Sequence, residues 1–160
     1  MVVTSRPAAA EDLLRLVELY GPALAEQVEL REAWRVAEGL PEPIAQAFLD
    51  VLADADSVLR VGLIDNVIFG LIWARIEPLL PQADGERIGV IRIVYVEEAA
   101  RTVGVGEAML AATLSELRSR GIRRFDAIVS PGHRLAKNFF ESADFKARRI
   151  TMYHRDSDEE

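Results

Sequence analysis

The first third of the chain carries apolar residues at helical spacing. Between residues 13 and 20 apolar side chains recur every three or four positions with acidic and basic residues between them. This pattern predicts a helix over residues 11–20, which Gly21-Pro22 should end. Similar patterns predict helices over residues 26–38 and 44–54. A short run over residues 2–6 predicts an edge strand ahead of them.

The pattern then changes to that of β-strands. Residues 58–64 and 67–76 are apolar and rich in β-branched side chains. Asp65-Asn66 separates them, and both residue types tolerate left-handed backbone angles, so we predict a hairpin. Residues 88–96 are almost continuously apolar, which is typical of a strand buried on both faces.

Helices and strands alternate in the last third. The apolar stripe over residues 104–120 predicts a helix, with Gly121 as its C-terminal cap. A short buried strand over residues 125–129 and a helix over 135–143 follow. Residues 145–155 predict a final strand or hairpin. The fold class is therefore α/β (α+β), with six to seven strands.

Composition narrows the classes of function. A length of 160 residues favours one domain, which we place at residues 1–155, followed by an acidic tail at 156–160. The formal net charge of −7 does not favour nucleic-acid binding, which needs a basic surface. The chain has no cysteine, so disulfides and thiolate metal sites are excluded, and we expect no metal. Without a signal peptide or membrane span in the sequence, we expect a cytoplasmic protein.

One turn joins a buried strand to a helix and carries two glycines. The segment Arg101-Thr102-Val103-Gly104-Val105-Gly106 follows residues 88–96 and begins the next helix. The first amides of a helix lack internal acceptors, and glycine lets a phosphate approach them closely. We therefore predict a phosphate-binding turn with Arg101 as a nearby cation. A tight turn without a ligand is the alternative. Position 109 is Met and no Gly-Lys-Ser/Thr follows, so neither a dinucleotide fingerprint nor a P-loop is present.

Around this turn the chain resembles the Gcn5-related N-acetyltransferases (GNAT). Their signature is Arg/Gln-x-x-Gly-x-Gly/Ala at the start of a helix, after a strand that ends in Val. Residues 94–110 match it in spacing and residue type. Residues 6–13 resemble the family's opening, 65–70 its second hairpin, and 136–145 its last helix and following strand, all in the family's order.

The resemblance implies a fold and a ligand. The fold would be acyl-CoA N-acyltransferase-like: a mixed, twisted sheet of six to seven strands with helices on both faces. The backbone of residues 94–96 would pair with the pantetheine arm of acetyl-CoA, and the amides of residues 103–107 would cradle its pyrophosphate. The residues expected to bind the coenzyme are Val94, Tyr95, Val96, Arg101, Thr102, Val103, Gly104, Val105, Gly106, Glu107, His133 and Phe140.

The chain departs from the family where proton transfer is concerned. Phe140 stands where many relatives have a Tyr that protonates the leaving thiolate, and His133 stands where Asn is common. Val90 and Ile128 occupy positions where relatives carry a Glu base, and Asp144 replaces a Gly. The resemblance therefore supports coenzyme binding more strongly than it supports any particular acid or base.

Two other side chains are candidates for acid–base catalysis. Glu97 lies at the predicted mouth of the cleft, although a solvated residue at a strand end is the alternative. Tyr153 lies on the predicted final strand, although it could be a packing residue. Arg92 is a charge on a buried strand: it is either paired with a buried acid or directed into the cleft toward an acidic group of the acceptor.

Three functions remain open on the sequence. The first is an acetyl-CoA-dependent N-acetyltransferase that acts on a small molecule or on a protein N-terminus or lysine, possibly as a homodimer. The second is a catalytically weakened relative that binds an acyl-CoA as a sensor or interaction module, because Phe140 replaces the usual acid. The third is a globular domain whose glycine turn has no ligand.

Overall fold

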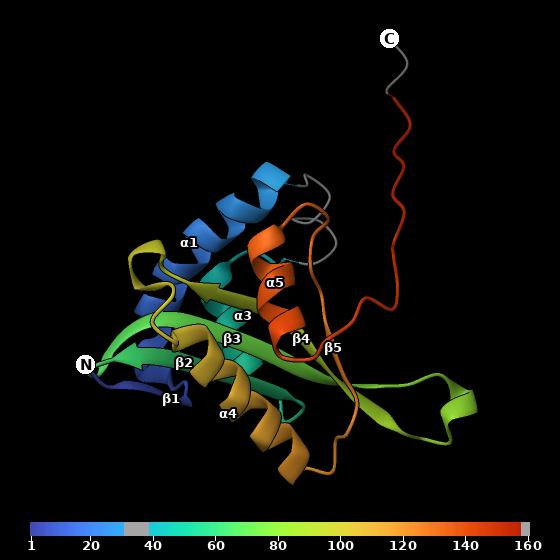
Figure 1. Cartoon of the computed structure of the whole chain (residues 1–160), viewed down its shortest axis with the longest axis horizontal. Coiled ribbons are helices and arrows are strands. Elements are labelled where there is room, and N and C mark those ends of the chain that lie inside the picture. Colours follow the sequence, from blue (N-terminus) through green and yellow to red (C-terminus); the bar gives the residue numbers. More distant parts are fainter. Residues whose placement is uncertain (31–38, 158–160) are drawn as a thin grey trace.

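The core of the protein is a five-stranded sheet. The computed structural model describes residues 1–30 and 39–157. The strands lie side by side in chain order (Figure 1), and they are β1 (Val3–Pro7), β2 (Ser57–Ile64), β3 (Val67–Pro78), β4 (Arg87–Val96) and β5 (Phe125–Ala127).

The sheet is mixed because its last pairing differs from the others. The first four strands pair antiparallel, while β5 runs parallel to β4. The predicted hairpin between β2 and β3 is confirmed: Asp65 and Asn66 form its turn with φ angles of 48° and 68°. Such left-handed angles are several times more common in Asn and Asp than in most residues.

Helices cover both faces of the sheet, as predicted. On one face lie α1 (Leu13–Leu30), which follows the short 3-10 turn η1 (Ala10–Asp12), and α3 (Ile44–Ala53). On the other lie α4 (Val105–Ser119) and α5 (Arg134–Ser142) (Figure 1). Two further 3-10 turns, η2 (Pro81–Ala83) and η3 (Glu98–Ala100), flank β4.

The alternation of side chains along β3 divides the hydrophobic interior into two cores. Leu71 faces α1 and α3, whereas its neighbours in sequence at Ile72 and Ala74 face α4. Successive residues of a strand point to opposite faces, so one strand supplies both cores. β4 also supplies both cores, through Ile93 and Ile91. These two residues lie two positions apart, and they reach opposite faces because the register between β3 and β4 shifts between them, at Arg92. The first half of β4 is buried on both sides, as its continuous apolar run predicted.

The prediction that the first helix ends at Gly21-Pro22 is wrong. α1 continues through Pro22 to Leu30. A proline in a helix interior costs about 3 kcal/mol, because it removes one backbone hydrogen bond and crowds the preceding turn. The burial of Leu19, Tyr20 and Ala23 on both sides of the proline offsets this cost. The second predicted helix therefore overlaps α1 as far as residue 30, and its remainder at residues 31–38 lies outside the described residues.

The predicted number of strands is also wrong. Over residues 1–30 and 39–157 the sheet has five strands, because residues 145–155 form no strand. Ile150 and Met152 are exposed there, and the segment runs away from the body (Figure 1). An alternating pattern predicts a strand, but a strand also needs a neighbour to pair with. Of the predicted acidic tail, residues 158–160 lie outside the described residues.

Two glycines allow α4 to lie close to the sheet. Gly62 on β2 pairs with Gly70 on β3, and Met109 of α4, fully buried, lies over both. A Cβ atom on Gly62 would lie 2.5 Å from Val105 Cγ1, and one on Gly70 would lie 2.9 Å from Met109 Cε. Real side chains do not approach so closely, so this pair of glycines sets the distance between helix and sheet.

A partly buried ion pair joins β1 to the start of α1. Arg6 Nη1 and Nη2 donate to Asp12 Oδ2 and Oδ1 at 2.7 and 2.9 Å, and the Ala9 N–H also donates to Asp12 Oδ2 at 2.9 Å. The hydrogen bond from Arg6 and the bond from Ala9 lower the pKa of Asp12, against its burial. The carboxylate also lies at the N-terminal end of a helix, where negative charge is favourable.

We expect Asp12→Asn to lower the free energy of unfolding by about 1–2 kcal/mol, since the half-exposed Arg6 weakens the effect through solvent screening. The contribution of a carboxyl whose folded pKa is depressed is complete above its unfolded pKa, near 4, and is lost as pH falls through the folded value. Urea unfolding between pH 2 and 7 should therefore show the two proteins converge below about pH 4. A constant difference at all pH values would contradict this account.

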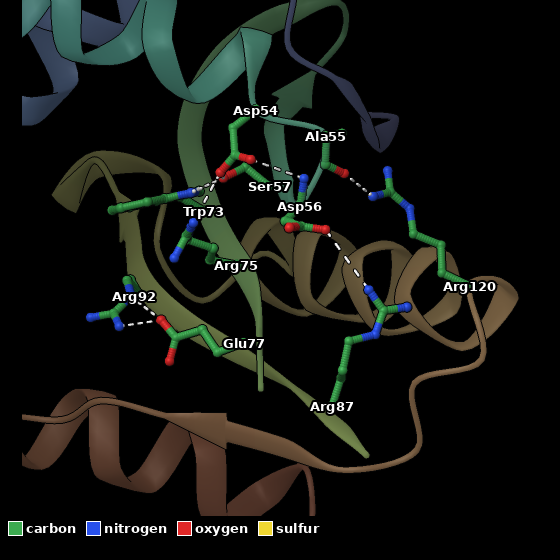
Figure 2. Close-up of polar contacts among 10 residues, drawn as sticks. All are labelled: Asp54, Ala55, Asp56, Ser57, Trp73, Arg75, Glu77, Arg87, Arg92 and Arg120. Carbon is green, nitrogen blue, oxygen red and sulfur yellow. Dashed lines mark hydrogen bonds and ion pairs between the residues drawn. The ribbon is translucent and has the colours of Figure 1, made fainter. Parts of the chain in front are cut away.

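Polar contacts pin the end of α3 to the sheet. Asp54 accepts hydrogen bonds from Ser57 Oγ at 2.8 Å and from Arg75 Nε at 3.2 Å, and the Trp73 indole donates to Ser57 Oγ at 3.1 Å (Figure 2). The hydrogen bonds from Ser57, from the Asp56 amide and from Arg75 lower the pKa of Asp54.

Within the described residues, no helix has the length and apolar character that a membrane crossing needs.

Candidate functional site

The main cleft opens between β4 and β5 on the side where α4 and α5 begin. Its volume is about 580 Å³, which lies in the range of pockets for small molecules and cofactors. Its floor consists of residues 92–96 of β4. Ile128, the residue that follows β5, also lines the cleft. Residues along most of α4 and α5, and the C-terminal half of α1, supply the walls.

The cleft exists because β5 leaves β4 early. Their parallel pairing covers Gly89 to Ile91 on β4, and the last bond runs from the Ile128 N–H to Ile91 O at 3.1 Å. Along the described residues, β4 has no strand partner on this side from Arg92 onward. This explains why the apolar residues at 94–96 are only half-buried. An exposed strand edge is also where an extended ligand can form hydrogen bonds with a backbone.

The turn before α4 has the geometry of an anion site. Thr102 and Gly104 have φ angles of 72° and 99°, and Val103 between them has no positive φ. A backbone that alternates in this way can form a concave row of amides. The first helical bond runs from the Ala108 N–H to Gly104 O at 3.0 Å. The amides of residues 105–107 precede it, so the helix itself provides them with no acceptor.

Most of the residues predicted to bind the coenzyme are brought together around this cleft. Val103 and Gly104 are the exceptions: they form the turn at its rim. The predicted residues that line the cleft are Val94, Tyr95, Val96, Arg101, Thr102, Val105, Gly106, Glu107, His133 and Phe140.

Arg101 ties the turn to two other elements. Its Nε donates to Val96 O at 2.9 Å, its guanidinium lies 5.5 Å from the centre of the Tyr95 ring, and its Nη2 donates to Glu26 Oε2 at 2.9 Å. The cation is therefore paired with a carboxylate that comes from α1. Burial raises the pKa of Tyr95, while Arg101 opposes that shift.

His133 completes a polar chain across the cleft. Its Nε2 lies 3.0 Å from Glu26 Oε1, and its Nδ1 lies 3.3 Å from Gln27 Nε2. Ser130 Oγ donates to Gln27 Oε1 at 2.6 Å. The chain joins α1, the turn before α4 and the turn before α5.

Three residues of this polar chain were not predicted from the sequence: Glu26, Gln27 and Ser130. The signal was present on α1: Leu16, Tyr20 and Ala23 are buried at spacings of four and three, and Gln27 continues that face. A polar residue on the buried face of a helix needs a partner. Ending the helix at Gly21-Pro22 hid this relation.

The two predicted catalytic candidates lie away from the cleft lining. Glu97 Oε1 accepts a hydrogen bond from Arg15 Nη2 at 2.5 Å, and the pair lies on the α1 side of the strand end. Tyr153 is 64% exposed in the segment without a strand. Neither is among the residues that line the cleft.

The first alternative raised for Arg92, pairing with an acid, is confirmed. Arg92 lines the cleft, and its guanidinium hydrogen-bonds Glu77 of β3 (Figure 2).

Phe140 lines the cleft too, but it is only 4% exposed and packs edge-on against Phe139 and Phe145.

Across residues 1–30 and 39–157, no cluster of His, Asp or Glu side chains is placed to hold a metal ion.

Comparison with known proteins identifies the family. Residues 20–145 match the sequence profile of the Acetyltransferase (GNAT) family. The mycothiol acetyltransferase of Cellulomonas flavigena is 30% identical over 93 residues, which are 56% of this chain and 27% of that protein. That of Amycolatopsis mediterranei is 38% identical over 58 residues, 36% of this chain and 19% of that protein. The chain thus spans only a fraction of the length of these relatives.

Solved structures agree over almost the whole chain. A transcriptional regulator from Bacillus halodurans has a TM-score of 0.76 at 25% identity and covers 96% of this chain and 99% of its own. A predicted acetyltransferase of Clostridium acetobutylicum, solved with acetyl-CoA, has a TM-score of 0.70 at 19% identity and covers 96% of each chain. The fold, the cleft beside the glycine turn and the match over residues 20–145 lead to one conclusion: the chain belongs to the GNAT family of acetyltransferases.

Proposed function

We propose that the protein is an acetyl-CoA-dependent N-acetyltransferase. The observation that carries this proposal is the cleft of about 580 Å³ between β4 and β5, which combines an unpaired strand edge with an amide-lined turn. The family membership and the names of the curated relatives support acetyl transfer. The acceptor is an amine of a small molecule or of a protein.

The cleft offers each part of acetyl-CoA a matching surface. The amides from Val103 to Glu107 bind the pyrophosphate, because helix-start N–H groups and the helix dipole favour anions. The backbone of residues 94–96 pairs with the amides of the pantetheine arm. Arg101 uses Val96 O in the structure, so a rotation of that side chain frees the carbonyl for the ligand.

The reaction requires little covalent chemistry from the protein. The amine nitrogen bonds to the thioester carbonyl carbon, the carbon–sulfur bond breaks, one proton leaves the nitrogen and one joins the sulfur. Holding the two reactants in contact inside a cleft supplies much of the acceleration. Glu97 is bound to Arg15 and Tyr153 is exposed, so neither is part of the proposed acid–base chemistry.

Two measurements test this function. Isothermal calorimetry with acetyl-CoA should show binding to one site per chain. Release of free CoA, followed with a thiol reagent across a panel of small amines and peptide N-termini, should show turnover with at least one acceptor. The chain has no cysteine, so the reagent does not react with the protein itself. Failure to bind acetyl-CoA would exclude the proposal.

A catalytically weakened acyl-CoA-binding protein is the second candidate, and Phe140 favours it. A positioned acid contributes about 10²–10⁴-fold to such reactions, and a phenyl ring has no proton to donate.

We expect Phe140→Tyr to change kcat by less than about tenfold, because the buried ring leaves a new hydroxyl poorly placed to reach the sulfur. Phe145→Tyr is the matched control, since Phe145 packs against Phe140 and does not line the cleft. A gain of 100-fold or more in the first variant alone would instead favour the weakened protein.

A further inference from the structure

The polar chain across the cleft fixes the protonation of one histidine. Ser130 Oγ–H donates to Gln27 Oε1, so the amide nitrogen of Gln27 is the group that faces His133 Nδ1. An amide nitrogen can only donate, so Nδ1 must be the acceptor. The ring proton is then on Nε2, which donates to Glu26 Oε1 at 3.0 Å. This orientation of Gln27 leaves Nδ1 as the lone-pair nitrogen of the ring, with Gln27 Nε2 as a weak partner.

The arrangement around the ring is suited to gaining a proton. The Gln27–Nδ1 contact of 3.3 Å is longer than a usual N–H bond to an acceptor, so an incoming donor can displace it. On the far side of the ring, the Glu26 carboxylate would stabilise the imidazolium that results. Arg101 holds the second oxygen of Glu26 at 2.9 Å and keeps the carboxylate in place. All of these groups except Ser130 line the cleft.

We propose that His133 accepts the proton of the acceptor amine through Nδ1, with Glu26 and Gln27 as positioning residues. This inference rests on the proposed acetyl transfer and names the base for it. As nitrogen bonds to the carbonyl carbon, its proton passes to Nδ1. The carbon–sulfur bond then breaks, the departing thiolate takes one proton from solvent, and the imidazolium releases one proton to solvent, so the imidazole returns to its neutral form in each turnover.

Several other charged or ionisable groups lie near the ring. Burial raises the pKa of Tyr95, which keeps the phenol neutral at physiological pH, and Arg101 stays charged. On α5 itself, Arg134 and Lys137 are exposed cations. The remaining charged residues that line the cleft are Arg92, Glu107 and Arg118. An imidazole ordinarily changes charge between about pH 5 and 8. We therefore expect His133 to dominate the dependence of kcat/KM on pH in that range.

The chain provides its own control, because it has only two histidines. His154 is exposed in the C-terminal segment, outside the cleft. We expect His133→Gln to lower kcat/KM about 100-fold and to remove the limb of the pH profile between about pH 5 and 8, while acetyl-CoA affinity measured by calorimetry changes little. His154→Gln should match the wild type in all three measurements.

Glu26→Gln separates a positioning role from general damage to the fold. The imidazolium would lose its carboxylate partner, so we expect kcat/KM to fall about tenfold and the limb to persist but move to lower pH. Nitrogen-15 spectra of the ring give a reading that needs no acceptor. His133 should show the Nε2–H form in the wild-type protein.

The outcomes distinguish this inference from the proposed function. An unchanged pH profile in His133→Gln, or a loss of acetyl-CoA binding that accounts for the lost activity, would overturn the inference and leave acetyl transfer intact. A wild-type protein that binds acetyl-CoA and acetylates no amine would overturn both.

Discussion

Gly104→Asp should lower the affinity for acetyl-CoA on the order of 100-fold or more. Gly104 lies at the start of α4 with a φ of 99°, and no atom lies within 4 Å of where its Cβ would be. Asp tolerates left-handed backbone angles better than most residues, so the turn can keep its shape. The added carboxylate would meet the pyrophosphate, and such like-charge contacts cost several kcal/mol. Calorimetry with acetyl-CoA measures the change.

Gly121→Asp is the matched control for this substitution. Gly121 follows the other end of the same helix with a φ of 84°, and it also has open space around its Cβ position. The backbone requirement is therefore the same at both positions, while only Gly104 lies in the turn that we propose for the pyrophosphate. Equal affinities in the two variants would place the pyrophosphate elsewhere.

Gly62→Val should destabilise the protein by about 3 kcal/mol or prevent it from folding. The new Cβ would lie 2.5 Å from Val105 Cγ1 and 2.8 Å from Met109 Cγ, so α4 would have to move away from β2. Overpacking of a core typically costs 1–3 kcal/mol, and Val adds two methyl groups beyond its Cβ. Urea unfolding followed by circular dichroism measures the loss.

Gly21→Ala provides the comparison for the effect of removing a glycine. Gly21 lies inside α1, and no atom is within 4 Å of its Cβ position. Ala is preferred over Gly in a helix by about 0.5–1 kcal/mol, so this variant should gain stability. A gain would also support the continuous helix, whereas a loss would contradict the placement of Gly21 within it.

Local patterns predicted most of the elements. The glycine turn, the hairpin at Asp65-Asn66 and the helices α3, α4 and α5 appear within one or two residues of their predicted limits. Each depends on neighbours in sequence, such as an apolar stripe or residues that accept a left-handed backbone. The same is true of the amide-lined turn, because a strand, two glycines and a helix follow one another directly.

Features that depend on distant contacts were not predictable in this way. α1 crosses Pro22 because tertiary burial outweighs a local preference, and residues 145–155 form no strand because pairing requires a partner. The chain from Glu26 to His133 spans 107 positions in sequence, so no local pattern could reveal it. Glu97 and Tyr153 were chosen by position along the chain, and only the structure places them outside the cleft lining.

The two walls of the cleft originate in different parts of the sequence. The wall that we propose for the coenzyme is built largely from backbone amides in the turn before α4, whereas the opposite wall includes the side chains of Glu26 and Gln27 on α1. Glu26 is bonded to Arg101 of the turn, but Gln27 bonds to His133 and Ser130. Under the proposed function, substitutions at Gln27 would therefore alter the chemistry offered to an acceptor and leave the turn in place. Related chains could evolve new acceptors by changing one helix, and a search that compares only the glycine signature would not detect the change.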